Sequence, residues 1–354
     1  MSKCTVVLIA LALLACGPVV GQENQRPGRE EVRALLRKVM ADYKAKDPEG
    51  FAELMKLRQT DRAAFRAKVL KMVKDARGKP DSTRKPPVFK APDSVKVVKD
   101  IVYATYGQRK VMLDMYLPTQ PPEGKLPCIM VIHGGGWRSG NKEKFARFAG
   151  AFAAKGFAAA CVGYRLRPEV DIPQCVEDVK AATRWVRANA AKYNINPDRL
   201  GAYGGSAGAH LAAMLGTSFN AKALEGKGGN AGISSRVHAV VTMATPSDLT
   251  KFSRAFQGDK DAATRISPAA HVDADSAAFL LMHARGDRVV PYSQATALAD
   301  KLKAAKVPVT LTTIDGNSHA FWNGRGPVAA KALADTMAFF TKTLKGSAPK
   351  AVTE

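Results

Sequence analysis

The chain has 354 residues, with 54 Lys and Arg against 31 Asp and Glu, so its formal net charge is +23. This length suits one large domain plus an extra segment. Only Cys128, Cys161 and Cys175 lie beyond residue 21, and their wide spacing excludes a disulfide framework and a Cys-rich metal cluster. Because Cys128 and Cys161 sit inside apolar runs, we expect them to be small buried side chains.

Residues 1–21 predict an export signal. Lys3 supplies a positive start, and the apolar stretch Val6–Ala15 is too short to span a bilayer. The small residues Val19–Gly21 form a cleavage site, so we expect a secreted or periplasmic protein. Cleavage before Cys16 would instead give a lipoprotein, but the leucine two positions earlier is unusual there. Nucleic acid is not an expected partner of an exported chain.

Residues 28–79 form a basic prefix that predicts two or three amphipathic helices. Asp47-Pro48 is typical of a turn that starts a new helix. Helical spacing is kept by two apolar sets, Val32, Leu35, Leu36 and Val39, and then Phe65, Val69, Met72 and Val73. The prefix carries no catalytic motif, so it either docks on the main domain or binds an anionic polymer or surface; the charge of the whole chain also fits a solubilised surface. The Pro-rich and basic residues 80–94 predict a linker.

Residues 95–345 predict an α/β domain. Alternating apolar and polar residues over 95–106 and 110–118, with Gly107-Gln108 between them, favour an antiparallel hairpin. Short apolar runs then alternate with helical patterns, which predicts a mostly parallel sheet of eight strands with helices on both faces. The six runs are CIMVIH, FAAACVGY, LGAYG, AVVTMA, AFLLMHA and VTLTTI.

One serine is packed among glycines and alanines in the stretch RLGAYGGSAGAHLAAML, which runs from Arg199 to Leu215. Ser206 lies between a predicted strand and a predicted helix and matches G-x-S-x-G. In such a turn the serine takes a strained conformation that exposes its hydroxyl at the edge of the sheet. Strand and helix then pass so closely that Gly204 and Gly208 must lack side chains.

Three glycines directly follow the apolar run that ends at Ile132, in the segment VIHGGGWRSGNK. The backbone amides of Gly135 and Gly136, together with that of Ala207, can hold an oxyanion. A phosphate-binding loop is the alternative, but the segment lacks both the G-x-G-x-x-G spacing and a final Lys-Ser/Thr. We expect His133 to hold this loop rather than to act as a base.

An acid and a histidine follow later strands in the order that a serine nucleophile requires. Asp287 comes just beyond one predicted strand and His319 just beyond the next, so the order is Ser206, Asp287, His319. Taken alone, Asp287 fits a turn and His319 fits a surface loop. No metal is expected, since the other histidines lack partners at ligand spacing; they are His210, His238, His271 and His283.

These motifs resemble the α/β-hydrolase superfamily and, within it, the H-G-G-G-W esterases of the feruloyl-esterase-like group first described from Bacteroidetes. The resemblance covers Val95 to Leu344. It departs at Ala284, where the family has a glycine near the acid, and at Ala277-Ala278, where it often has Pro-Pro. The matching segments are HGGGW, GYRL, DVKAATRWVRANAAKYNINPDRLGAYGGSAGAHLAAM, TPSDL, SPAAHV, HARGD and the one around His319.

The resemblance implies an α/β-hydrolase fold and a serine hydrolase that needs no cofactor. Ser206 attacks an ester carbonyl, His319 moves the proton, Asp287 orients the histidine, and the three amides bind the oxyanion. We expect four aromatic residues to wall the substrate pocket, with core packing as the alternative for each: Trp137, Tyr164, Phe321 and Trp322.

The expected function is an exported carboxylic ester hydrolase acting on a small ester or on acetyl or feruloyl esters of a polysaccharide. An arylformamidase is the alternative enzyme, although export argues against its cytosolic substrate. A peptidase of the prolyl-oligopeptidase type is disfavoured because the chain has no room for a propeller. A non-catalytic binding protein on a hydrolase fold is a different class of alternative, but such a protein would be expected to lose Ser206 or His319.

Overall fold

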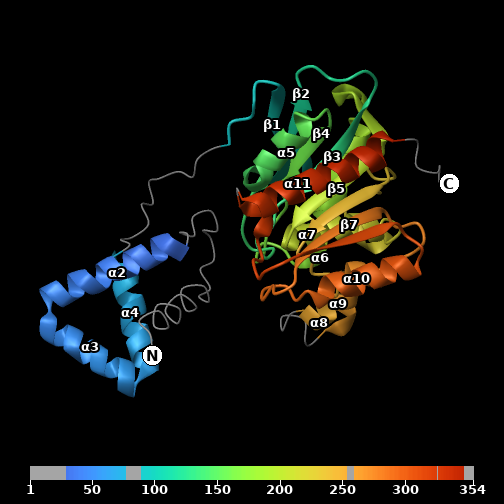
Figure 1. Cartoon of the computed structure of the whole chain (residues 1–354). Helices are drawn as coiled ribbons and strands as arrows, with labels where there is room; N and C mark the ends of the chain where they lie inside the picture. Colours follow the sequence, from blue (N-terminus) through green and yellow to red (C-terminus); the bar gives the residue numbers. More distant parts are fainter. Residues whose placement is uncertain (1–28, 77–88, 253–258, 325, 347–354) are drawn as a thin grey trace. The chain divides into compact units, whose positions relative to one another are not determined.

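The computed structural model describes residues 29–76, 89–252, 259–324 and 326–346. The predicted export signal at residues 1–21, with Cys16, and linker residues 80–88 lie outside this part of the chain. Two compact units are present, Met1–Val88 and Phe89–Glu354, and Figure 1 shows the elements of each. In the described part, no helix combines the length and the apolar character that crossing a membrane requires.

The first unit contains three helices in its described residues: α2 (Arg29–Lys46), α3 (Pro48–Thr60) and α4 (Arg62–Ala76). Asp47 caps α3, because its carboxylate accepts the Gly50 amide at 2.8 Å, and Pro48 occupies the first turn, where no amide is needed. Asp61 caps α4 in the same way. The helices meet around a small apolar core of Val39, Leu54, Val69 and Val73.

The second unit is built on an eight-stranded sheet with the strand order β1-β2-β4-β3-β5-β6-β7-β8. The hairpin β1–β2 is antiparallel, as predicted, and β2 pairs antiparallel with β4, while all other pairs are parallel. The strands are β1 (Val95–Tyr106), β2 (Arg109–Pro118), β3 (Leu126–Ile132), β4 (Ala158–Val162), β5 (Ile195–Gly205), β6 (Ala239–Met243), β7 (Ala278–Ala284) and β8 (Val309–Ile314).

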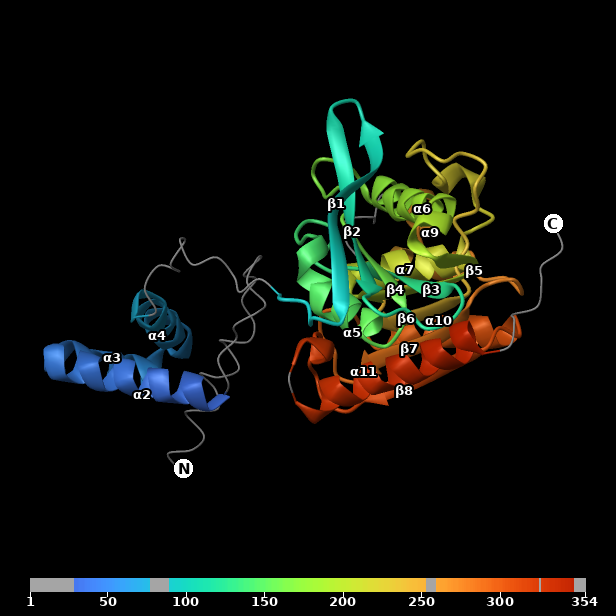
Figure 2. The ribbon, with the colours of Figure 1, turned by 90° about the horizontal axis from the view of Figure 1, so that it is seen from above.

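Helices cover both faces of this sheet, which is why β3 is buried along its whole length. The side chains of Ile129 and Val131 pack toward one face with α5 (Ala146–Ala153) and α11 (Pro327–Phe340). The side chains of Met130 and Ile132 pack toward the other face with α6 (Ile172–Ala188), α7 (Ala207–Thr217) and α10 (Ser293–Ala304). Figure 2 shows α5 and α11 on one side and α6 and α7 on the other. Two short helices follow β6, α8 (Leu249–Phe252) and α9 (Lys260–Arg265).

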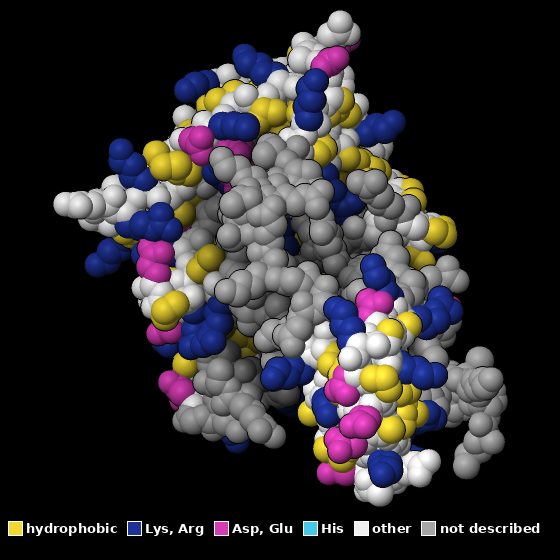
Figure 3. Space-filling view, turned by 90° about the vertical axis from the view of Figure 1, so that its left-hand side faces the viewer, with side chains coloured by type: hydrophobic (Ala, Val, Ile, Leu, Met, Phe, Trp, Pro, Cys, Tyr) yellow, Lys and Arg dark blue, Asp and Glu magenta, His cyan; other side chains and the backbone are white. Residues whose placement is uncertain are grey.

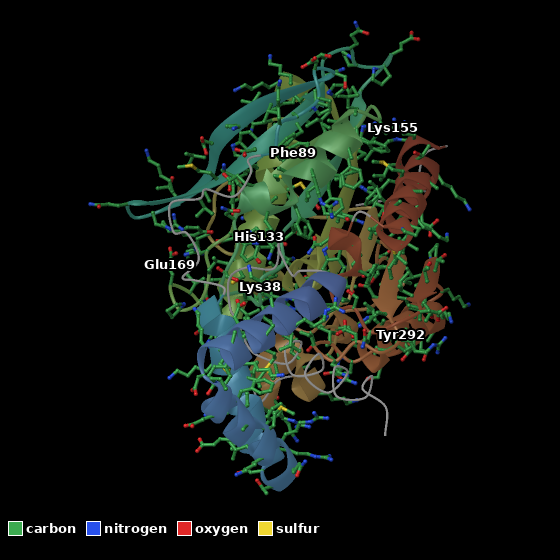
Figure 4. The ribbon with its side chains drawn as sticks, turned by 60° about the vertical axis from the view of Figure 1, so that its left-hand side comes forward. Lys38, Phe89, His133, Lys155, Glu169 and Tyr292 are labelled. Carbon is green, nitrogen blue, oxygen red and sulfur yellow. The ribbon has the colours of Figure 1, made fainter. Side chains whose placement is uncertain are left out.

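The first residue of the second unit, Phe89, packs against its first α-helix, α5. Phe89, labelled in Figure 4, packs so closely on α5 that a Cβ atom at Gly150 would lie 2.7 Å from its ring.

The cysteines of this unit, Cys128, Cys161 and Cys175, are buried and free, as expected for the first two. On the face of the molecule in Figure 3, Lys and Arg side chains are scattered among acidic and hydrophobic ones. The positive charge on this face is therefore distributed over the described surface.

Candidate active site

The nucleophile turn joins β5 to α7 at the carboxyl edge of the sheet. Ser206 has φ +56° and ψ −123°, a conformation that L-residues rarely adopt. A Cβ atom at Gly204 would overlap with the Gly208 carbonyl, and one at Gly208 would overlap with the Ile132 carbonyl. The strained turn and the need for glycine two positions either side of Ser206 are therefore both confirmed.

The structure brings Ser206, His319 and Asp287 into one hydrogen-bonded row. His319 Nδ1 donates to Asp287 Oδ2 at 2.7 Å, which leaves the Nε2 lone pair to accept the Ser206 hydroxyl at 2.9 Å. The Asp287 side chain is fully buried, whereas 14% of the His319 side chain is exposed. The three come from turns after β5, β7 and β8, whose parallel carboxyl ends share one edge of the sheet.

Asp287 is held by more than His319. Its Oδ1 accepts the amides of Val289 at 2.8 Å and Val290 at 3.1 Å, and His283 Nε2 lies 3.4 Å from its Oδ2. Burial alone would raise the pKa of Asp287, but the hydrogen bonds from His283 and His319 hold that pKa well below its usual range. The carboxylate is therefore charged and fixed in orientation.

His283 is the supporting residue that the sequence interpretation missed. It lies in the apolar strand β7, and its Nε2 also donates to the Val290 carbonyl at 2.9 Å. Its position four residues before Asp287 in HARGD is the available signal, because it places both side chains near the end of one strand.

The turns that carry the acid and the histidine are tied together by their backbones. Arg285 N–H donates to the Ile314 carbonyl at 2.9 Å, and Gly286 N–H donates to the Gly316 carbonyl at 2.8 Å. These bonds extend the β7–β8 pairing past the ends of the strands. The turn that carries Asp287 is consequently fixed against the start of the loop that carries His319.

The peptide groups of the glycine loop after β3 are oriented by their carbonyls. The Gly134 carbonyl accepts His133 Nδ1–H at 3.0 Å, and the Gly135 carbonyl accepts the Arg138 and Ser139 amides, each at 3.1 Å. In a trans peptide the N–H points opposite to the C=O, so the amides of Gly135 and Gly136 point away from these partners. Neither amide donates to another of the described residues.

This loop lies directly beside the nucleophile. A Cβ atom at Gly134 would overlap with the Gly205 carbonyl and would lie 3.3 Å from Ser206 Cβ. Ala207 begins α7, so its N–H is one of the amides at a helix start that have no intrahelical partner. Three backbone amides near Ser206 are thus available for a negatively charged oxygen, as the sequence predicts for Gly135, Gly136 and Ala207.

His133, labelled in Figure 4, is buried behind the loop. Its ring stacks on Tyr164 with centroids 4.4 Å apart, and the Tyr164 hydroxyl donates to the His133 carbonyl at 2.9 Å. Burial lowers the pKa of His133 to about 4, so the ring is neutral at pH 7. These contacts match the expectation that His133 holds the loop and does not act as a base.

The four aromatic residues predicted for the pocket lie in different surroundings. Trp322 borders the row of three, because its ring is 5.7 Å from His319 and a Cβ atom at Gly205 would lie 2.6 Å from it. Phe321 packs edge-on against Trp322. All four side chains are buried, and the Tyr164 hydroxyl donates to the His133 carbonyl at the base of the glycine loop. Trp137 belongs to the loop itself.

Metal ligands were not expected from the sequence. Within the residues that the structure describes, no group of three or more His, Cys, Asp or Glu side chains could hold a metal ion.

The sheet order, the nucleophile turn and the Ser-His-Asp row define the class as an α/β hydrolase with serine-hydrolase geometry. Residues 113–302, more than half of the chain, match the family described as BD-FAE. The chain belongs to the BD-FAE family.

Individual proteins support the same class. The probable carboxylic ester hydrolase LipM of Mycobacterium tuberculosis is 29% identical over 241 residues, which is 63% of this chain and 56% of LipM. The chain thus spans little more than half the length of that relative. A solved structure titled as a truncated carbohydrate esterase from gut microbiota is 30% identical, with a TM-score of 0.65, and covers 72% of this chain and 100% of its own.

A second solved structure is of an esterase that reacted with an organophosphate. It is esterase 2 of Thermogutta terrifontis "phosphorylated by paraoxon", which is 28% identical to this chain, with a TM-score of 0.65. The match covers 75% of this chain and 100% of that one. The region shared with these structures corresponds in extent to the second unit.

Proposed function

We propose that the chain is a carboxylic ester hydrolase that forms an acyl-enzyme on Ser206. The observation that carries the proposal is the continuous row from buried Asp287 through His319 to the Ser206 hydroxyl, with bonds of 2.7 and 2.9 Å. A serine hydroxyl is a weak nucleophile unless a positioned base removes its proton. The row supplies that base and the group that orients it.

The reaction proceeds in two halves. Ser206 Oγ bonds to the ester carbonyl carbon as its proton moves to His319 Nε2, and the carbonyl oxygen becomes an oxyanion facing the amides. The carbon–alkoxy bond then breaks, and His319 returns the proton to the leaving alcohol. Water attacks the acyl group, again losing its proton to His319, and the acid leaves as Ser206 regains its hydrogen. Asp287 stays ionised and stabilises the imidazolium in both halves.

The substrate that we propose is an acetyl or feruloyl ester on a polysaccharide or a small related ester. The family match and the carbohydrate esterase among the similar structures support this choice. The proposed mechanism requires no cofactor, since the nucleophile, the base and the oxyanion donors all belong to the chain.

We further propose that the chain is exported and that its helical unit binds an anionic polymer or surface. The positive start and short apolar stretch of residues 1–21 support secretion or periplasmic export, with lipid attachment at Cys16 as the alternative. The basic residues of α2 to α4 support binding to an anionic polymer or surface. Fractionation of the source cells tests the first point, and the truncation described in the Discussion tests the second.

An activity screen tests the central proposal. The purified mature chain is assayed on p-nitrophenyl acetate, methyl ferulate, acetylated xylan and N-formylkynurenine, with Ser206→Ala as the matched control. We expect ester cleavage that the control lacks. Cleavage of N-formylkynurenine alone would favour an arylformamidase, and no turnover of any compound would favour a non-catalytic binding protein.

A further inference from the structure

A buried histidine to which the proposed reaction gives no role connects the nucleophile helix to the glycine loop. His210 lies one turn after Ser206 in α7 and is fully buried. Its Nδ1 accepts the indole N–H of Trp137 at 3.2 Å, and the two rings meet edge to face with centroids 5.3 Å apart. Trp137 directly follows Gly135 and Gly136.

The other nitrogen of His210 sets its tautomer. His210 Nε2 lies 2.6 Å from the Ile266 carbonyl, which can only accept, so Nε2 carries the hydrogen. The Nδ1 lone pair is then free for the Trp137 indole. Burial lowers the pKa of His210 to about 4, which keeps the ring neutral at pH 7. His210 is therefore a fixed acceptor within the core of the unit.

Trp137 needs such an anchor because its backbone is strained. Its φ is +57°, in the left-handed region that a bulky residue rarely occupies. Its carbonyl accepts the Arg167 amide at 2.8 Å, and its side chain is held by His210. If the indole were released, the backbone could relax toward an ordinary conformation and rotate the adjoining Gly136–Trp137 peptide, which would displace Gly136.

We propose that His210 is a positioning residue for the oxyanion amides. By holding the Trp137 indole, it keeps the loop in the conformation that turns the Gly136 amide toward Ser206. The His210 amide also donates to the Ser206 carbonyl at 3.0 Å, so one residue contacts both the nucleophile turn and the loop. This inference rests on the proposed function, because the amides matter only when a carbonyl oxygen becomes charged.

The expected signature is a loss in kcat and not in KM, since the oxyanion exists only in the transition state and intermediate. His210→Phe keeps a ring but removes the acceptor, and Trp137→Phe removes the donor from the other end of the same bond. With p-nitrophenyl acetate, each variant should lower kcat by about 10- to 100-fold and change KM by less than about 2-fold, less than the loss of a whole oxyanion donor. The double variant should be no slower than the slower single variant, because both remove one link.

Two further variants separate positioning from general core damage. His210→Gln retains a side-chain acceptor and should recover part of the lost kcat. His238→Phe changes a partly buried histidine that stands just before β6, at the opposite end of the strand from the site, and should leave kcat within about 2-fold of wild type because it does not touch the oxyanion loop. Hydrogen exchange of the Trp137 indole, measured by NMR, reports the bond without reference to activity: exchange should be slow in the wild type and fast in His210→Phe.

The outcomes are distinguishable. Wild-type kcat in folded His210→Phe and Trp137→Phe, additive losses in the double variant, or rapid indole exchange in the wild type would each overturn the inference. If His210→Phe does not fold, Trp137→Phe and His210→Gln test the same bond. A wild-type chain that cleaves none of the esters would instead overturn the proposed function.

Discussion

The units Met1–Val88 and Phe89–Glu354 both pack helices around apolar side chains, but within their described residues strained backbone is found only in the second. Every described non-glycine residue with positive φ lies beyond residue 89, and Ser206 and Trp137 are among them. Such conformations cost about 1–3 kcal/mol each and persist where the surrounding structure enforces them. Two of the seven such residues, Ser206 and Trp137, lie at the nucleophile turn and the oxyanion loop, so part of this conformational energy is spent on placing the reacting groups.

The helical unit, Met1–Val88, has a small apolar core and many charged residues. Its described core consists of four buried apolar side chains, and the charged side chains that the structure describes there are exposed or partly exposed. Burial of one such side chain contributes about 1.5–3 kcal/mol before the entropy of ordering the chain is subtracted. Nothing in its described residues has the geometry of a reacting group. We therefore expect the chemistry to reside in the second unit and the first to act through charge.

The largest expected effect is on the nucleophile. Ser206→Ala should lower kcat for p-nitrophenyl acetate by several orders of magnitude, because the residues of a triad act as a unit. Circular dichroism should show an unchanged fold, since only one oxygen is removed. A folded variant that kept more than about a tenth of the wild-type kcat would remove Ser206 from the mechanism, since loss of a triad member costs far more.

The partners of Ser206 should follow in order of their distance from the substrate. His319→Ala should match Ser206→Ala, and the double variant should be no worse than either single one. Asp287→Asn should cost less, because His319 can still reach Ser206 in a poorer tautomer. Steady-state kinetics of the wild type and these four variants measure this order. A harmless His319→Ala beside an inactive variant at another histidine would contradict it.

Acid should destabilise the second unit through its histidines, since all six histidines of the chain lie beyond residue 88. Burial lowers the pKa of His133, His210 and His238 from 6.5 to about 4. Between pH 6.5 and 4 these three side chains therefore bind more protons in the unfolded chain than in the folded one, and their contribution to the free energy of unfolding falls as pH falls. Each group contributes a slope of up to about 1.4 kcal/mol per pH unit.

Urea unfolding followed by tryptophan fluorescence at pH 7 and pH 5 measures this loss. The control is His238→Phe, which removes one of the three groups and should make the pH dependence shallower. An unfolding free energy that stays constant or rises on acidification would show that these rings are not held neutral in the folded protein.

The smallest effect on catalysis is expected from removing the first unit. A chain starting at Val88 keeps Phe89, which packs on α5, and should fold and cleave p-nitrophenyl acetate at nearly the wild-type rate. The full chain should bind an anionic polysaccharide more tightly than the truncated one, and added salt should reduce the difference, because exposed charges are screened within about 8–10 Å at physiological ionic strength. An inactive truncation would make the helices structural parts of the hydrolase. Equal polymer binding would leave their charge as solubilisation.

The mostly parallel sheet and the triad of Ser206, His319 and Asp287 could be predicted from the sequence for a physical reason. Buried parallel strands are continuous apolar runs, and their carboxyl ends meet at one edge, so Ser206 and His319 could be brought together although 113 residues separate them. From the sequence, His210 and His283 were considered only as metal ligands and were set aside because they lack partners at ligand spacing. Their partners, the Ile266 and Val290 carbonyls, come from irregular loops whose packing has no periodic signal. For Tyr164 the sequence left pocket wall and core packing open, because an aromatic residue near a strand end suits either role.

Covalent labelling tests the central claim most directly. The full mature chain and its Ser206→Ala variant are treated with paraoxon, and intact mass and peptide mapping by mass spectrometry locate any adduct. The account predicts one diethylphosphoryl group per wild-type chain, on Ser206, and none on the variant, with loss of esterase activity in proportion to labelling. Labelling of another residue, or full activity in a chain labelled on Ser206, would contradict it.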